Sequence, residues 1–155
     1  MRKNSAPAFT LIELLVVITI IGILAAMAIP FFQSYRLRSK MAAVVSEFKT
    51  IETAAIAYYQ DHNSYPLDRF PGILPPGMND FLSEDFFTSE TPVGGVYDYE
   101  GPPAWPVAGV SIRNAYGNGA EEWNTLDSML DDGNTSTGKF RFTNGWYVYV
   151  FDENP

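Results

Sequence analysis

The sequence contains no cysteine and a single histidine among its 155 residues. The lack of cysteine excludes disulfide bonds, thiolate metal sites, cysteine nucleophiles and a lipid anchor on an N-terminal cysteine. The lone His62 has no second histidine with which to share a metal ion, so a role at a helix end is favoured. The sequence also lacks a glycine-rich phosphate loop, an H-E-x-x-H pair and a nucleophile elbow. It offers no catalytic set, and we expect the protein not to be an enzyme.

Positive charge is also scarce: 10 basic residues face 18 acidic ones, for a formal net charge of −8. From Asp61 to the end, the cations are Arg69, Arg113, Lys139 and Arg141. A nucleic-acid partner requires a positive surface, so we expect none. A solvated acidic surface that keeps the domain soluble accounts for the excess of carboxylates.

One long apolar run lies near the N-terminus, at residues 14–32, with the sequence LLVVITIIGILAAMAIPFF. About 19 uncharged residues form a helix about 28 Å long, which matches the hydrocarbon core of a bilayer. This segment predicts a transmembrane helix. The alternative is a secretory signal cleaved after Ala28, because Ala26-Met27-Ala28 forms an A-x-A pattern. The acidic Glu13 and the continuation of the run beyond Ala28 both argue against that alternative.

Glu13 is an acidic residue inside the hydrophobic stretch AFTLIELLVV. A carboxylate costs about 2.5–3.5 kcal/mol at the centre of a membrane helix and less toward its edge, so a partner is expected. Cleavage before Phe9 would place a new α-ammonium four residues away, where it would pair with Glu13 of its own chain or of a neighbour. The alternative is that Glu13 lies at headgroup depth and is hydrated.

Residues 2–30, RKNSAPAFTLIELLVVITIIGILAAMAIP, resemble the leader and N-terminal helix of type IV prepilins and type II secretion prepseudopilins. The resemblance implies cleavage between Ala8 and Phe9 by a prepilin peptidase and N-methylation of Phe9. It also implies that Glu13 is required for assembly and that Pro30 kinks the helix. The family prefers glycine at the position of Ala8.

The same resemblance implies three regions: a leader at 1–8, a transmembrane and assembly helix at 9–33, and a periplasmic domain at 34–155. The chain would be a single-pass protein of the bacterial inner membrane, with membrane lipid, an inner-membrane assembly platform, other pilin-like subunits and further copies of itself as partners. Basic residues flank the helix on both sides, so charge alone does not set its orientation.

The expected function is that of a structural subunit of a type IV pilus-like or type II secretion pseudopilus filament. Pilus subunits often close their C-terminal loop with a disulfide, so a cysteine-free chain is more similar to a major pseudopilin. Two alternatives remain: a minor pilin that presents a ligand-binding domain, and a monomeric, membrane-anchored exported protein.

The rest of the sequence, together with the apolar run, predicts an α+β fold. In this fold a long N-terminal helix, transmembrane and then amphipathic, packs on a small antiparallel sheet. An apolar stripe extends the helix to about His62. Residues 64–92 predict a long loop with one helical turn near 80–87. Strands are expected at 96–99 and 107–112, a helix at 121–130, and a hairpin at 139–151 around Asn144-Gly145. The stripe consists of Leu37, Met41, Val44, Phe48, Ile51, Ala55 and Tyr58.

A dense oxygen cluster occurs in the segment TLDSMLDDGN: Asp127, Asp131, Asp132 and Asn134. Calcium takes six to eight hard oxygen ligands, so closely spaced carboxylates beside a glycine turn indicate a candidate Ca²⁺ site. The spacing is not that of an EF-hand. The alternative is the end of a helix that carries solvated charges.

Overall fold

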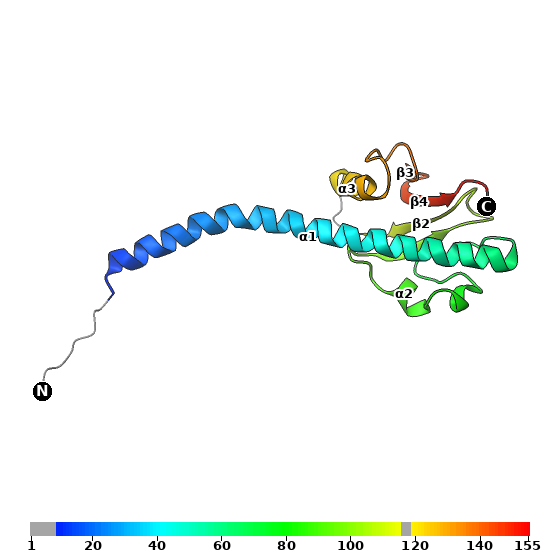
Figure 1. The fold of residues 1–155 in the computed structure, drawn as a ribbon, viewed down its shortest axis with the longest axis horizontal. Coiled ribbons are helices and arrows are strands. Elements are labelled where there is room, and N and C mark those ends of the chain that lie inside the picture. Colours follow the sequence, from blue (N-terminus) through cyan, green and yellow to red (C-terminus); the bar gives the residue numbers. More distant parts are fainter. Residues whose placement is uncertain (1–8, 116–118) are drawn as a thin grey trace, which may run out of the picture. The chain divides into compact units, whose positions relative to one another are not determined.

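The computed structural model describes residues 9–115 and 119–155, and it divides into two compact units, one up to Leu37 and one from Arg38. The described residues form one long helix, three short helical segments and a sheet of four strands, whose arrangement can be followed in Figure 1. The predicted α+β class is confirmed. The elements in chain order are α1 Leu11–His62, η1 Met78–Asp80, α2 Glu84–Thr88, β1 Val96–Glu100, β2 Ala108–Arg113, α3 Ala120–Leu130, β3 Phe140–Thr143 and β4 Trp146–Asp152.

Helix α1 is 52 residues long and is assigned without a break through Pro30. It ends at His62, as predicted. Asn63 takes a left-handed conformation with φ of 52°, and its backbone N–H donates to the carbonyl of Tyr59 at 2.8 Å. Asparagine tolerates this conformation better than most residues, so it closes the helix. The kink expected at Pro30 stays a prediction.

The part of α1 that belongs to the second unit packs on the sheet through the predicted apolar stripe. Phe48 is fully buried, and its ring stacks on Tyr149 of β4 with centroids 5.8 Å apart. The same ring meets Tyr97 of β1 edge-on at 5.9 Å. Aromatic rings in these geometries stabilise a core beyond the area that they bury. The buried residues of α1 are Met41, Val44, Phe48, Ile51, Ala54 and Ala55.

The sheet is antiparallel throughout, with the order β1-β2-β4-β3. Residues Asn144 and Gly145, with φ of 50° and 88°, form the two-residue turn between β3 and β4. Both angles suit the hairpin turn that Asn-Gly favours, so the predicted hairpin is confirmed. Val110 of β2 lies opposite Tyr149 of β4, and this pairing joins the β1–β2 and β3–β4 pairs into one sheet.

Helices α2 and α3 lie on opposite sides of α1 in Figure 1. Phe87 of α2 packs on Tyr97 at 6.2 Å, and Trp123 of α3 stacks on Tyr147 of β4 at 5.0 Å. Between α1 and β1 the structure has two short helices where one turn was predicted. They are separate because Ser83 is extended, with φ of −68° and ψ of 135°, which interrupts helical hydrogen bonding.

The sheet face opposite α1 is polar at one end and apolar at the other. Arg113, Asp98 and Glu100 are buried together there, and Val107, Val148 and Val150 form a small apolar cluster beside Trp105. Both faces of the sheet are therefore covered within the second unit.

Candidate functional site

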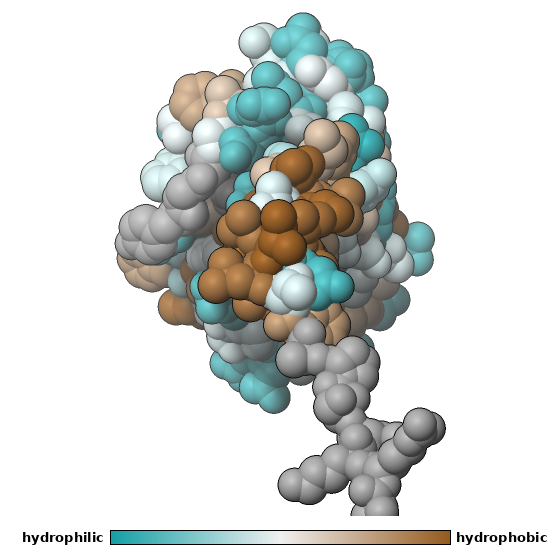
Figure 2. All heavy atoms as spheres, turned by 90° about the vertical axis from the view of Figure 1, so that its left-hand side faces the viewer, coloured by the Kyte–Doolittle hydropathy of each residue, from teal (hydrophilic) through white to brown (hydrophobic). Residues whose placement is uncertain are grey.

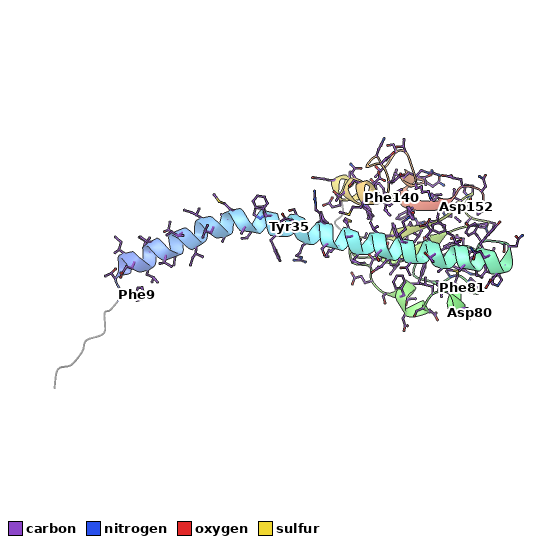
Figure 3. All side chains as sticks on the ribbon, in the orientation of Figure 1. Phe9, Tyr35, Asp80, Phe81, Phe140 and Asp152 are labelled. Carbon is purple, nitrogen blue, oxygen red and sulfur yellow. The ribbon has the colours of Figure 1, made fainter. Side chains whose placement is uncertain are left out.

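The first candidate site is the beginning of α1, which holds the predicted cleavage and assembly residues. Phe9 is the first described residue, and its side chain is 84% exposed (Figure 3). Ala8 lies outside the described residues. Glu13 lies in the first turn of the helix.

Thr10 and Glu13 form a reciprocal cap on α1. The backbone N–H and the hydroxyl of Thr10 each donate to Oε2 of Glu13 at 2.8 Å. The backbone N–H of Glu13 in turn points to the hydroxyl of Thr10 at 3.3 Å. This is the capping-box geometry, in which side chains satisfy N–H groups that have no partner within the helix. Glu13 thus has a local function at the start of the helix in addition to its predicted role in assembly.

The apolar segment that follows is exposed along its whole length. None of residues 9–36 is buried, and Leu14, Ile18, Ile21 and Leu24 are all between 55% and 61% exposed. In Figure 2 the hydrophobic side chains of this segment form the brown area that faces the viewer. Patches of exposed apolar surface on this scale mark a membrane or a protein interface.

The first part of α1 is long and apolar enough to cross a membrane, with a mean hydropathy of 2.8 in its most apolar window. Among the charged side chains of α1, Glu13 alone precedes Arg36. These properties are consistent with a membrane-anchored protein.

The second candidate site is the acidic cluster at the end of α3. Asp127 belongs to α3, whereas Asp131 and Asp132 follow its last residue. One carboxylate oxygen from each of the three lies within 4.8 Å of the others. The structure therefore brings together three of the four predicted ligands. The amide oxygen of the fourth, Asn134, accepts a hydrogen bond from the backbone N–H of Ser136 at 3.2 Å.

The three carboxylates are bonded very differently. Oδ2 of Asp131 accepts from the backbone N–H of Lys139. Asp132 accepts from the N–H of Asn134 and from the hydroxyl of Thr137, each at 2.8 Å. Asp127 is fully buried, and its carboxylate lies beside the carboxylate of Asp132 and the backbone N–H of Asn134. Burial first, and then the charges of Asp132 and Asp131, raise the pKa of Asp127 to about 6.

A third polar cluster was not identified from the sequence. Arg113 donates through Nε to Asp98 at 2.6 Å and through a terminal nitrogen to Glu100 at 2.5 Å. Ser111 also donates to Glu100, at 2.6 Å. Burial raises the pKa of Asp98 to about 6 and that of Glu100 to about 7. One guanidinium thus pairs with two buried carboxylates. When both carboxylates are ionised, this structural cluster carries one negative charge without a positive partner.

The sequence did carry signals for the two features that were missed. The pattern Thr10-x-x-Glu13 at the start of an apolar run is the signature of a capping box. Asp98 and Glu100 alternate with tyrosines, as Ser111 and Arg113 alternate with Val110 and Ile112, so both strands have a polar face. Such a face ordinarily lies in solvent, and nothing in one strand shows that the chain will cover it.

Comparison with known proteins adds two family models. A model described as the prokaryotic N-terminal methylation motif matches residues 3–29, and a model described as the C-terminal part of PilW matches residues 37–111. Together they cover most of α1, the segment after it and the first two strands.

Several curated proteins are similar to this chain. The fimbrial protein EcpC of Eikenella corrodens is 44% identical over 62% of this chain and 63% of its own length. The type IV major pilin PilE1 of Neisseria gonorrhoeae is 34% identical over 57% of this chain and 40% of its own length. The matches thus span less than two thirds of these relatives.

A solved structure is also similar: that of the major type IV pilin PilA1 from Clostridium difficile, with 18% sequence identity and a TM-score of 0.48 over 75% of this chain and 96% of that one. From the methylation motif, the related pilins and the apolar helix that precedes the domain, we conclude that this chain is a type IV pilin-like protein.

Proposed function

We propose that the protein is a structural subunit of a type IV pilus-like or pseudopilus filament. Residues 9–33 would hold it in the bacterial inner membrane, with residues 34–155 in the periplasm, and a prepilin peptidase would remove the leader at 1–8. The observation that supports this proposal best is the exposed apolar helix α1, which starts two residues after Phe9 and carries Glu13 in its first turn.

Cleavage between Ala8 and Phe9 would convert a neutral amide into an α-ammonium next to the Thr10–Glu13 cap. Both bonds from Thr10 reach Oε2 of Glu13, and within the described residues no hydrogen bond reaches Oε1. That oxygen is free to accept from an ammonium of the same chain or of a neighbouring subunit. The pair would form only after processing, so an unprocessed subunit would lack the charge that steers docking.

Assembly along this route changes the surroundings of the helix without exposing it to water. Side chains such as Leu15 and Ile21 would pass from lipid to a bundle of like helices, so their apolar surface stays out of water. Small residues such as Gly22 and Ala25 allow helices to approach closely. The charge pair at Glu13, and not the hydrophobic effect, would then favour the filament over the membrane.

Processing is tested by N-terminal sequencing and intact mass of the chain from membranes of a host that contains a prepilin peptidase. The expected polypeptide begins with methylated Phe9. A chain that begins with Met1 would show that no processing occurs, and one that begins with Ile29 would show an ordinary secretory signal. Either result would overturn the proposed route.

Assembly is tested by comparing Glu13→Ala with Glu90→Ala, which removes an exposed carboxylate from the second unit. We expect the Glu13→Ala subunit to be inserted and processed but to yield at least about tenfold fewer filaments, whereas the Glu90→Ala subunit assembles normally. Filaments are counted by electron microscopy of sheared fractions. Normal yield from Glu13→Ala would contradict the assembly mechanism.

A surface pilus and a pseudopilus would place the protein at different locations in the cell. The similar proteins are named as pilins and fimbrial proteins, which favours a surface pilus, whereas the absence of cysteine favoured a pseudopilus. Immunogold labelling at native expression separates them. Label along surface filaments supports a pilus, and label confined to the cell envelope supports a pseudopilus.

A further inference from the structure

We propose that Arg36, Arg38 and Lys40 form a basic collar on α1 that binds the phosphate groups of anionic phospholipids at the membrane surface. The collar rests on the proposed function, because residues 9–33 must span the membrane, but it requires neither cleavage before Phe9 nor filament assembly. It gives a function to the basic residues that follow the apolar run, which the proposed route of assembly leaves unused.

Positive charge is concentrated directly after the apolar run. Three of the 10 basic residues lie within five consecutive positions of α1. No acidic residue lies between Glu13 and Glu47, and all of the 18 acidic residues except Glu13 come after the collar. An anionic membrane surface attracts a basic segment beside a membrane helix and repels an acidic domain. The collar is therefore the segment of the exported chain that such a surface would attract.

The side chains of the collar have no partner among the residues that the structure describes. All three are exposed. Within residues 9–115 and 119–155 the ion pairs involve Lys49, Arg113 and Arg141 but none of the collar cations. Long cationic side chains that are exposed and unpaired can form charge-assisted hydrogen bonds to an external anion.

The collar lies at the depth of the phospholipid headgroups when residues 14–32 span the hydrocarbon core. At a rise of about 1.5 Å per residue, Arg36 follows Phe32 by about 6 Å and Lys40 follows it by about 12 Å. The headgroup region extends about 5–8 Å beyond the core on each side. Side chains on a helix tilt toward its N-terminus, here toward the bilayer, and long cationic side chains reach back to the interface. Tyr35, which is 70% exposed (Figure 3), adds an aromatic ring of the kind enriched at this depth.

The distribution of the three cations around the helix favours lipid over a protein partner. Arg36 and Lys40 are four residues apart and share one side of the helix, whereas Arg38 lies on the opposite side. A neighbouring subunit would contact one side, but headgroups surround a membrane helix on all sides. Arginine suits this partner, because its planar guanidinium binds a phosphate through two parallel hydrogen bonds.

A collar bound to phosphate would make extraction of the subunit depend on the lipid. Transfer of α1 from the bilayer to a bundle of like helices keeps its apolar side chains out of water, but it breaks the contacts between the collar and the headgroups. Anionic lipid would therefore retain an unassembled subunit in the membrane.

The test uses the full chain reconstituted in vesicles of equal parts phosphatidylcholine and phosphatidylglycerol. Electron paramagnetic resonance of lipids that are spin-labelled on their acyl chains measures how strongly each lipid associates with the inserted protein. We expect phosphatidylglycerol to associate at least about threefold more strongly than phosphatidylcholine at low salt. The ratio should fall in about 1 M NaCl, where the Debye length is about 3 Å. Equal association of the two lipids at low salt would overturn the proposal.

Matched variants assign the selectivity to the collar. Arg36→Gln/Lys40→Gln removes one arginine and one lysine from it, and Arg69→Gln/Lys139→Gln removes the same two residue types from exposed positions in the second unit. We expect the first variant to lower the association ratio at least about twofold and the second to keep it. Addition of Arg38→Gln to the first variant should lower the ratio further. A ratio that stays unchanged in this triple variant would refute the collar.

Two further outcomes would each reveal a different partner and contradict the proposal. Inorganic phosphate should reduce the ratio no more than sodium chloride does at the same ionic strength, and a larger reduction would mean that the collar binds free phosphate. Loss of filaments from the triple variant with an unchanged lipid ratio would mean that the collar contacts a neighbouring subunit. Resistance to carbonate extraction verifies insertion separately. A failure of cleavage or assembly would leave the lipid measurement intact, because it is made on the inserted, unassembled chain.

Discussion

The hydroxyl of Tyr97 on β1 donates a hydrogen bond to the carboxylate of Glu47 on α1 and so joins the sheet to the helix. Tyr149 on β4 makes a similar connection, because it accepts from Lys49 and donates to Glu52 at 3.1 Å. The hydroxyl of Tyr99 is also buried on this face, but it has no hydrogen-bond partner within the described residues. The three tyrosines lie on the same face of the sheet, and they differ in whether their hydroxyl groups have a hydrogen-bond partner.

This difference predicts opposite effects for two identical substitutions. Tyr97→Phe should lower the free energy of unfolding by about 1–2 kcal/mol, because it removes a hydrogen bond to a carboxylate. Tyr99→Phe should leave it unchanged or raise it by about 1 kcal/mol, because it removes an unpaired polar group. Urea titration of the full chain in micelles, followed by tryptophan fluorescence, measures both. Equal losses in the two variants would show that Tyr99 has a partner.

The centre of the core gives the largest predicted loss of stability. Phe48 is fully buried and contacts the rings of Tyr97, Tyr149 and Phe140. Phe48→Ala should therefore lower the free energy of unfolding by about 3–5 kcal/mol. Phe70 is the matched control, since its side chain is 78% exposed. Phe70→Ala should change stability by less than about 0.5 kcal/mol in the same urea titration. A small effect at Phe48 would mean that α1 does not pack on the sheet as described.

The sequence predicted those elements whose signals are local. The spacing of Met41, Phe48 and Ile51 identifies the buried face of a helix without knowledge of what covers it, and Asn144-Gly145 identifies a hairpin by its backbone angles alone. The pairing of β2 with β4 depends on segments about 40 residues apart in the chain, and no local pattern specifies it. The same reason explains why the sheet order was not predicted.

The candidate sites likewise divide into those that a local sequence pattern predicts and those that only tertiary contacts create. Asp127, Asp131 and Asp132 are close in sequence, so their cluster was predicted, but the burial of Asp127 follows from tertiary packing. Arg113 meets Asp98 and Glu100 only because β1 and β2 pair in one register and the outer face is covered. A charged residue on a strand ordinarily indicates a face exposed to solvent. This expectation is wrong where another part of the chain covers that face.

The raised pKa values of the acidic residues around Arg113 predict that the free energy of unfolding falls as pH rises. The pKa of Glu100 is raised to about 7 and that of Asp98 to about 6, in each case mainly by burial, with Ser111 and Arg113 opposing the rise at Glu100. The nearby Asp68 also has a raised pKa. The folded chain therefore holds protons that the unfolded chain releases above about pH 4–5, and the stabilisation is lost as pH passes the folded pKa values.

We accordingly expect the free energy of unfolding to fall by about 1–3 kcal/mol between pH 5 and pH 8, since one pKa unit corresponds to about 1.4 kcal/mol. Glu100→Gln should flatten this dependence, whereas Glu90→Gln, an exposed control, should retain it. The slope is the measured quantity, so a constant loss of stability in Glu100→Gln does not affect the test. Parallel pH profiles for Glu100→Gln and the unmodified chain would exclude Glu100 as the source.

The cap at the start of α1 allows the two roles of Glu13 to be separated. Thr10→Val removes the hydroxyl that donates to Glu13 and keeps both the size of the side chain and the charge of Glu13. The backbone N–H of Thr10 still donates to the carboxylate. The loss of a threonine cap costs about 0.5–2 kcal/mol of helix stability, which frays the first turn but leaves the apolar helix intact.

If the charge of Glu13 steers assembly, the Thr10→Val subunit should be processed before Phe9 and should form filaments at a yield within about threefold of the unmodified chain. Glu13→Gln keeps a side chain of similar shape that can still accept from Thr10, but it lacks the charge, so its yield should fall as far as that of Glu13→Ala. Electron microscopy of sheared fractions counts the filaments, and intact mass verifies processing. The reverse order, with Thr10→Val deficient and Glu13→Gln normal, would mean that Glu13 acts as a helix cap and that the new ammonium has another partner.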